Sequence, residues 1–284
     1  MNYTKKKLYL SKFKRKIFVL KIGGEVVQEK IILEKILKDI KELINYGIKV
    51  VLVHGGGKQA DVLAHQIGHK PVKVNGRRVT SEKDLEIAKM LYGGSLNLEI
   101  LVLMKKLKMK GIRVSGLDGN LLSVCLRDKH PFDFGYVGDI KKVNPKIIKD
   151  LLKEKYMPVV SPLAGTSDGV IVNINADTIA TELAIALKAE KLILFTAVDG
   201  IYHGKKLLNF LTLEESKKAI SDGYVKDGMA VKLTNCMRAV EGGVKRVHVI
   251  NGLYPHSLLG EVLTKQGIGT MIISDKEKYA YSNE

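Results

Sequence analysis

The chain has 284 residues, of which 45% are hydrophobic and 27% charged, a composition typical of a globular protein with one large α/β domain or two lobes. The formal net charge of +17 would suit a nucleic-acid binder, but the lysines are spread through helical stretches and no aromatic-rich RNA motif accompanies them. We therefore attribute the positive charge to a general bias toward lysine and not to a nucleic-acid partner. The electric field of these lysines would still attract an anionic substrate.

Residues 1–16 form a basic extension ahead of the first predicted strand. The extension lacks the long apolar stretch and the small-residue cleavage site of a secretory signal. Residues 2–16 form either a short amphipathic helix, with Leu8, Leu10 and Phe13 apolar, or a basic disordered tail. No apolar run elsewhere approaches the roughly 20 residues that span a bilayer, and the two cysteines have no metal-type spacing. We expect a cytoplasmic protein.

Strand-like apolar runs alternate with amphipathic helical segments from residue 17 onward. Strands are predicted at 17–22, 49–53, 111–114, 157–161, 191–195, 246–250 and 271–274, the last as an edge strand. Helices are predicted at 29–46, from the glycines at 55–57 through Ala64, at 82–108 with a break at Gly93-Gly94, at 173–188 after a turn, near 213–222 and near 230–241. Hairpin strands are predicted within 120–143. This order predicts an α/β fold with a mainly parallel sheet covered on both faces, and a soft lobe boundary near residue 190.

Two predicted strands end in glycine turns, Gly23-Gly24 and Gly55-Gly56-Gly57. Ligands of parallel sheets bind outside the carboxyl ends of the strands. Glycine lets backbone N–H groups approach a phosphate closely, and a helix start behind the turn favours anions. A glycine pair after a strand is more often only a turn, so neither turn alone establishes a phosphate site.

Several polar residues lie at positions where chemistry is plausible. Lys21 interrupts an apolar run, where a lysine is costly unless it has a partner. In the loop pair Arg77-Arg78, Arg78 offers a guanidinium fork that suits a carboxylate, and Lys232 lies near a helix start. For Arg78 and Lys232 the alternative is a solvated side chain.

The segment Asn173-Ile-Asn-Ala-Asp177 leads from a strand into an alanine-rich helix. Asn and Asp are common helix caps, so capping accounts for one of Asn173 and Asp177. The P-loop, the GxGxxG pattern and the protein-kinase motifs are all missing from the sequence, and no Ser/His/Asp triad is indicated.

Five motifs, spread over about residues 17–274, resemble those of the acetylglutamate kinases, a group within the amino acid kinase family. They are Phe18-Val-Leu-Lys-Ile-Gly-Gly24, Val53-His-Gly-Gly-Gly57, Asn75-Gly-Arg-Arg-Val-Thr80, Asn173-Ile-Asn-Ala-Asp177 and Asp227-Gly-Met-Ala-Val-Lys232. The resemblance implies an αβα sandwich, with an N-terminal lobe at 17–190 that binds acetylglutamate and forms a homodimer, and a C-terminal lobe at 191–284 that binds ATP.

The resemblance also implies an activity, the ATP-dependent phosphorylation of the γ-carboxylate of N-acetyl-L-glutamate to N-acetylglutamyl 5-phosphate in arginine biosynthesis, with Mg²⁺ carried by ATP. Lys21 and Lys232 would stabilise charge on the transferred phosphoryl group, and Asp177 would orient them. Gly24 and Gly56 would cradle that group. Because a carboxylate acceptor is already ionised at pH 7, no general base is required.

The same resemblance assigns the acceptor side. Gly56 and Gly57 would contact the substrate, Arg78 would pair with its α-carboxylate, and Asn173 would hold its amino-acid end. No resident metal site is implied.

On the nucleotide side, the resemblance implies contacts from Thr196, Asp199 and Lys232, with one departure. The family strand commonly ends in a Ser/Thr-Asp pair, and Ala197 stands where that aspartate is expected. Asp199 lies two residues on and, in a strand, would point to the same face.

The segment from Pro255 to Thr270 resembles the arginine-inhibited branch of the family. It implies an L-arginine site that includes His256, Glu261 and Gly267, and an N-terminal helix that links dimers into a hexamer. Two other functions stay open: a related kinase that acts on carrier-linked aminoadipate, which the intact NxNAD motif disfavours, and a catalytically weak ligand sensor, which Ala197 suggests.

Overall fold

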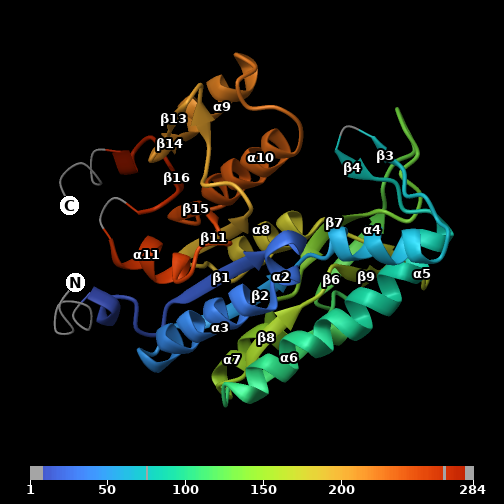
Figure 1. Cartoon of the computed structure of the whole chain (residues 1–284), viewed down its shortest axis with the longest axis horizontal. Coiled ribbons are helices and arrows are strands. Elements are labelled where there is room, and N and C mark those ends of the chain that lie inside the picture. The colour runs from blue at the N-terminus through green and yellow to red at the C-terminus, as the bar shows by residue number, and fades with distance from the viewer. Residues whose placement is uncertain (1–8, 75, 265–266, 279–284) are drawn as a thin grey trace.

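A computed structural model describes residues 9–74, 76–264 and 267–278. Within these residues an eight-stranded sheet runs through the molecule (Figure 1), in the order β14 (Phe210–Thr212), β16 (Thr270–Ile273), β15 (Arg246–Asn251), β11 (Lys191–Thr196), β1 (Ile17–Ile22), β2 (Lys49–His54), β8 (Met157–Val160) and β5 (Gly111–Val114). Neighbouring strands are parallel except β15 and β16. The predicted mainly parallel sheet is confirmed. It continues across the predicted lobe boundary near residue 190, because β1 pairs directly with β11.

The prediction that 271–274 forms an edge strand is wrong. β16 lies between β15 and β14, with Val249 opposite Thr270 and Phe210 opposite Met271. The edge is β14, a strand of three residues. Such a short strand carries too little apolar periodicity to be recognised in the sequence.

Helices cover both faces of the sheet, which confirms the αβα sandwich. One face packs against α7 (Lys146–Lys153), α8 (Ala176–Ala186), α9 (Leu213–Ser221) and α10 (Asp227–Glu241). The other packs against α2 (Gly24–Gln28), α3 (Lys30–Asn45), α4 (Gly57–Gln66), α5 (Glu82–Met90), α6 (Leu96–Lys106) and α11 (Ser257–Leu263).

The sequence pattern of each layer explains its burial. The central strand β1 is buried from Phe18 to Ile22, as expected for a parallel strand covered on both faces. Helix α3 instead buries one stripe, with Leu33, Ile36, Ile40 and Leu43 fully or almost fully enclosed. Burial of each such side chain contributes about 2 kcal/mol to the free energy of unfolding.

The predicted long helix at 82–108 is interrupted as expected. A π-helical segment, Leu91–Ser95, joins α5 to α6, and Gly94 has non-helical dihedral angles there. Among the described residues, Glu82–Lys106 is one helical stretch long and apolar enough to cross a membrane by length and composition, although the sequence shows no uninterrupted apolar run. It packs in the helical layer over the sheet, and 44% of its most apolar window is buried.

Four two-stranded sheets lie outside the main sheet in the part of the chain that the structure describes. They are β3 (Lys73–Val74) with β4 (Arg77–Arg78), β6 (Leu122–Leu126) with β7 (Gly138–Val143), β9 (Leu163–Gly165) with β10 (Ile171–Asn173), and β12 (Tyr202–His203) with β13 (Lys206–Leu207). The β6–β7 pair confirms the hairpin predicted within 120–143. The β3–β4 hairpin carries Arg78, which the sequence placed in a loop.

Part of the basic extension packs on the core. Residues 9–11 are helical, Leu10 is fully buried, and the Phe13 ring lies 5.5 Å from the Phe18 ring. This described part therefore favours the short helix over a tail, while Leu8 lies outside the described residues.

Candidate active site

The two glycine turns lie side by side at the carboxyl ends of β1 and β2. These strands are parallel neighbours, with Ile22 opposite His54, and α2 and α4 begin directly behind them. A Cβ atom on Gly24 would lie 3.1 Å from the Gly57 nitrogen. The two turns therefore approach each other so closely that only glycine fits at Gly24 without a shift.

Packing also explains the glycine at position 56. A Cβ atom there would lie 2.7 Å from Cε1 of Tyr92 and 2.8 Å from Cδ2 of Leu96. Behind the turn, burial lowers the pKa of His54 to about 4. This histidine is therefore a neutral core residue near pH 7.

Lys21, Asp177 and Lys232 form a buried ion cluster beside the turns. The Lys21 Nζ atom lies 2.8 Å from Oδ1 of Asp177, and the Lys232 Nζ atom lies 2.6 Å from Oδ2 of the same carboxylate. All three side chains are about nine-tenths buried, with 10%, 10% and 12% of their surface exposed. The prediction that Asp177 orients both lysines agrees with this geometry.

The charges in this cluster shift the pKa values of its members in different directions. Burial would raise the pKa of Asp177, but the two ammonium groups hold it far below the usual 3.8. Burial, with repulsion from Lys232, lowers the pKa of Lys21, whereas the attraction of Asp177 outweighs burial and raises that of Lys232. With all three groups ionised, the cluster carries one net positive charge, suited to a phosphoryl group in transfer.

The NxNAD segment serves three purposes. Asn175 caps α8, because its side chain accepts hydrogen bonds from the backbone N–H groups of Asp177 and Thr178. The prediction that capping accounts for Asn173 or Asp177 is therefore wrong. Asp177 reaches the lysines, and Asn173 Nδ2 donates to Oγ1 of the buried Thr80 at 3.2 Å.

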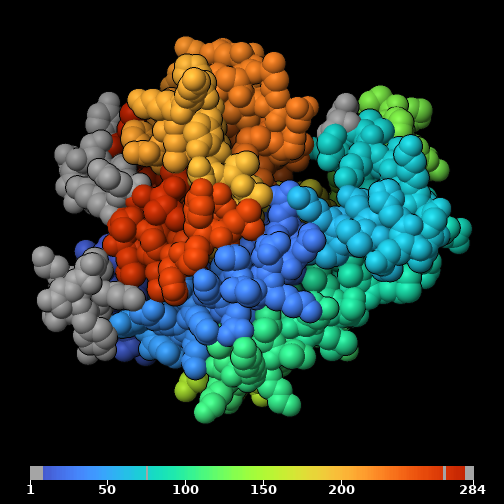
Figure 2. Space-filling view, in the orientation of Figure 1, coloured from blue at the N-terminus to red at the C-terminus, as the bar shows by residue number. Residues whose placement is uncertain are grey.

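A cleft of about 440 Å³ extends along the glycine turns, Lys21, Asp177 and Asn173. Figure 2 shows the surface hollowed between α10 and the region of the β3–β4 hairpin. The cleft is lined by seven of the residues predicted to act in the site, namely Lys21, Gly24, Gly56, Gly57, Arg78, Asn173 and Asp177. Lys232 is not among the lining residues, but it is paired with Asp177, which is.

Sequence reasoning missed several further cleft residues, namely Lys58, Asp61, Lys73, Tyr92 and Arg127. Lys58 directly follows the second glycine turn, which was a usable signal, but the lysine-rich composition obscured it. Arg127 comes from the β6–β7 hairpin region, and nothing in the local sequence predicts that it reaches this cleft.

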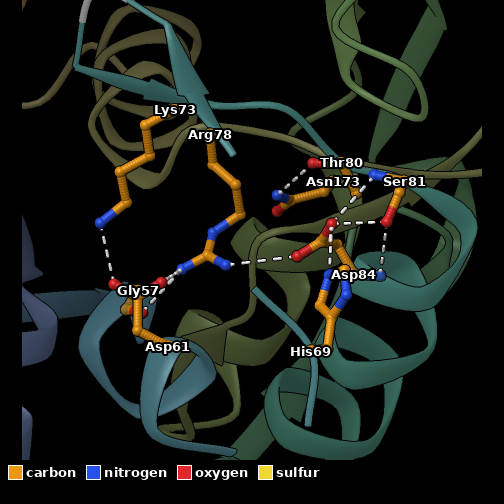
Figure 3. Close-up of polar contacts among 9 residues, drawn as sticks. All are labelled: Gly57, Asp61, His69, Lys73, Arg78, Thr80, Ser81, Asp84 and Asn173. Carbon is orange, nitrogen blue, oxygen red and sulfur yellow. Dashed lines mark hydrogen bonds and ion pairs between the residues drawn. The ribbon is translucent and has the colours of Figure 1, made fainter. Parts of the chain in front are cut away.

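Arg78 lies on the cleft wall, and its guanidinium group makes three polar contacts (Figure 3). Its Nη2 donates to the Gly57 carbonyl at 2.9 Å and to Oδ1 of Asp61, and its Nη1 lies 3.5 Å from Oδ1 of Asp84. Lys73 Nζ donates to the other oxygen of Asp61 at 2.8 Å. The β3–β4 hairpin is thus tied to α4 and α5 by carboxylates.

The residues predicted for the nucleotide side do not line this cleft. β11 ends at Thr196, so the strand alternation expected to place Asp199 does not extend to it. Asp199 instead accepts hydrogen bonds from Asn251 Nδ2 and the Tyr202 hydroxyl, both at 2.9 Å. Ala197 lines a separate hollow beside Glu25.

The three residues predicted for arginine lie around α11. Glu261 is buried and accepts hydrogen bonds from the Ile268 and Gly269 nitrogens, and its Oε1 lies 2.6 Å from Nδ1 of His248. Gly267 packs against this carboxylate, whereas His256 precedes α11 and pairs with Asp39 on α3 at 2.8 Å.

Comparisons with known proteins agree with this geometry. The model of the amino acid kinase family matches residues 16–251. The acetylglutamate kinase of Kosmotoga olearia is 44% identical over 93% of both chains, and that of Halothermothrix orenii is 38% identical over 94% of both.

A solved structure of the N-acetylglutamate synthase from Neisseria gonorrhoeae, complexed with coenzyme A and N-acetyl-glutamate, is 27% identical and superposes with a TM-score of 0.87. That likeness covers 96% of this chain, which spans 63% of the synthase chain. The chain therefore belongs to the acetylglutamate kinases of the amino acid kinase family.

Proposed function

We propose that this member of the amino acid kinase family transfers the γ-phosphoryl group of ATP to the side-chain carboxylate of N-acetyl-L-glutamate, a step of arginine biosynthesis. The relatives named acetylglutamate kinase support the substrate. The observation that carries the proposal is the convergence of Lys21 and Lys232 on Asp177, next to two glycine turns and in reach of a cleft that also holds Arg78 and Asn173.

The chemistry follows from these positions. The acceptor carboxylate is ionised at pH 7 and needs no base, so the rate comes from alignment and from neutralisation of charge. We place the transferred phosphoryl group between the backbone N–H groups at Gly24 and Gly56 and the two lysine ammonium groups. Buried cations stabilise the charge that spreads over the equatorial oxygens during transfer.

At the other end of the substrate, we place the α-carboxylate on Arg78 and the amino-acid end on Asn173. Gly57 contributes backbone contacts between them. This pose spans the cleft from the lysine cluster to the β3–β4 hairpin, whose residue Gly76 lies close to Gly228 at the start of α10.

We propose that the lobe at 17–190 binds the acceptor and the lobe at 191–284 binds ATP, with Thr196, Asp199 and Lys232 on the nucleotide side. The described residues contain no group of three or more His, Cys, Asp or Glu side chains that could hold a metal ion. Following the family resemblance, we propose Mg²⁺ as part of the MgATP substrate, held by phosphate oxygens and water.

We also propose a homodimer formed through the long helix of the N-terminal lobe. Its segment α6 exposes 50% of Leu98 and 66% of Val102, and Met90 at the end of α5 is 55% exposed. Exposed apolar side chains at helical spacing suit an interface between copies. We propose a cytoplasmic location as well.

Inhibition by L-arginine is a further proposal. A second structure of the Neisseria synthase, complexed with coenzyme A and L-arginine, is 26% identical with a TM-score of 0.86. In this chain Glu261, Gly267 and His256, which lie around α11, would contribute to the site, and an unchanged rate at millimolar L-arginine would exclude it.

The function is tested by measuring ADP release with MgATP and N-acetyl-L-glutamate, beside parallel reactions with aminoadipate and glutamate. We expect turnover with acetylglutamate and much less with the other two. Turnover with none of the three would replace the kinase by the ligand sensor that Ala197 suggests.

A further inference from the structure

The existing contacts of Arg78 leave neither bidentate edge of its guanidinium group free for the carboxylate of a substrate. A guanidinium group binds a carboxylate through two parallel N–H bonds, and both edges that offer such a pair include Nη2. In this structure Nη2 already donates to the Gly57 carbonyl and to Asp61. Bidentate binding of a substrate carboxylate therefore requires that one of these two contacts opens.

Asp61 is the partner that can leave. Its side chain is 25% exposed and lines the cleft, whereas Asp84, the other carboxylate near Arg78, is 3% exposed. Asp84 is also fixed through its second oxygen, which accepts a 2.5 Å hydrogen bond from the Ser81 hydroxyl and lies 3.1 Å from Nε2 of His69. The Gly57 carbonyl belongs to the backbone of α4.

Asp61 would remain paired after it leaves Arg78. Its Oδ2 accepts from Lys73 Nζ at 2.8 Å, so its charge stays compensated on the cleft wall (Figure 3). Partial burial would raise the pKa of Asp61, but Lys73 and Arg78 hold it below the ordinary value. The side chain is thus a carboxylate, chemically equivalent to the group that the substrate brings.

We infer that Asp61 competes with the substrate for Arg78: the α-carboxylate of the acceptor binds Arg78 by displacing Asp61, which stays on Lys73. Asp84 keeps the guanidinium plane in place during this exchange. Asp61 therefore lowers the affinity for the acceptor. It favours ligands whose carboxylate binds Arg78 more tightly than Asp61 does. The inference rests on the proposed function and names a residue that the sequence motifs do not include.

The test compares Asp61→Asn with the wild-type enzyme by steady-state kinetics. Loss of the competing charge should lower KM for acetylglutamate about fivefold, the size of one partly exposed ion pair. The kcat and the KM for ATP should stay unchanged, and calorimetric titration with acetylglutamate should show the same gain in affinity.

Two controls separate displacement from a general change in charge. Asp139→Asn removes an aspartate that pairs with another cleft arginine, Arg127, at 2.6 Å, and should leave KM unchanged. The analogue 4-acetamidobutyrate lacks the α-carboxylate but keeps the reacting one. The Asp61 substitution should not improve the KM for this analogue.

Asp61→Ala serves as a second variant, because alanine is the best helix former and preserves α4 if asparagine does not. A raised or unchanged KM for acetylglutamate in both variants would overturn the inference, since Asp61 would then position Arg78 or do nothing. An equal gain in Asp139→Asn or with 4-acetamidobutyrate would overturn it as well. Absence of wild-type turnover refutes the proposed function instead, so the two failures are distinguishable.

Discussion

The two sides of the proposed reaction differ in where the structure places their residues. On the acceptor side, Arg78 and Asn173 line one cleft and are tied to α4, α5 and Thr80. On the nucleotide side, Thr196 is the last residue of β11, and Asp199 beyond it accepts hydrogen bonds from the nearby Tyr202 and from Asn251 at the end of β15. The acceptor residues thus meet in one cleft, whereas Thr196 and Asp199 do not line it.

The lysine cluster belongs to both sides and should show the largest effect. We expect Lys21→Met to lower kcat about a thousandfold, because a preorganised charge next to the transferred group is lost. KM for either substrate should change much less. A kcat within tenfold of the wild-type value would show that Lys21 does not act on the reacting group.

Asp177→Asn should lower the free energy of unfolding as well as kcat. Removal of the carboxylate leaves two buried ammonium groups facing each other, which destabilises the fold by about 3 kcal/mol. Chemical denaturation measures this difference, with Asp139→Asn as a surface control.

The pH dependence of that difference follows from the lowered pKa of Asp177. Its contribution to stability is fully present above the unfolded value of 3.8 and is lost only as the pH falls through the lower folded pKa. The gap in melting temperature between wild type and Asp177→Asn should therefore be constant from pH 7 to about 4 and shrink below that. A gap that already shrinks near pH 6 would contradict the assignment.

Arg78→Lys and Asp199→Asn test the comparison directly. Arg78→Lys loses the bidentate fork and should raise KM for acetylglutamate about thirtyfold without changing KM for ATP. Asp199→Asn should do the reverse on a smaller scale, raising KM for ATP about threefold. If Asp199→Asn altered only the acetylglutamate KM, the division into two sides would be wrong.

The smallest expected effect comes from Thr80→Val, which keeps the shape of a buried side chain but removes the acceptor for Asn173. We expect KM for acetylglutamate to rise about fourfold, as for one lost neutral hydrogen bond. Serine at the same position should restore most of the affinity.

These regions also show what a sequence can predict. The strand positions, the glycine turns and Lys21 were predictable, because buried strands and close backbone approaches leave strong local patterns. The same holds for the break near Gly94. Motifs then brought Asp177 and Lys232 together across 55 residues of sequence, a contact that periodicity alone does not indicate.

Other features had no local signal. β14 is too short to show periodicity. The cap of α8 is Asn175, but the sequence alone does not show which of the polar residues at 173, 175 and 177 takes the capping position. Asp61 lies in an ordinary amphipathic helix, so its pairing with Arg78 depends on how the β3–β4 hairpin folds over α4. Such contacts between distant segments require the fold.

The most direct test traps the product. An acyl phosphate reacts with hydroxylamine to give a hydroxamate, which is coloured with ferric ion, so formation of the acyl phosphate can be followed separately from ATP hydrolysis. We predict hydroxamate in amounts equal to ADP when the protein receives MgATP and N-acetyl-L-glutamate, none without the acceptor, and formation about a thousandfold slower with Lys21→Met. ADP without hydroxamate, or no ADP from a folded protein, would contradict phosphorylation of the acceptor carboxylate.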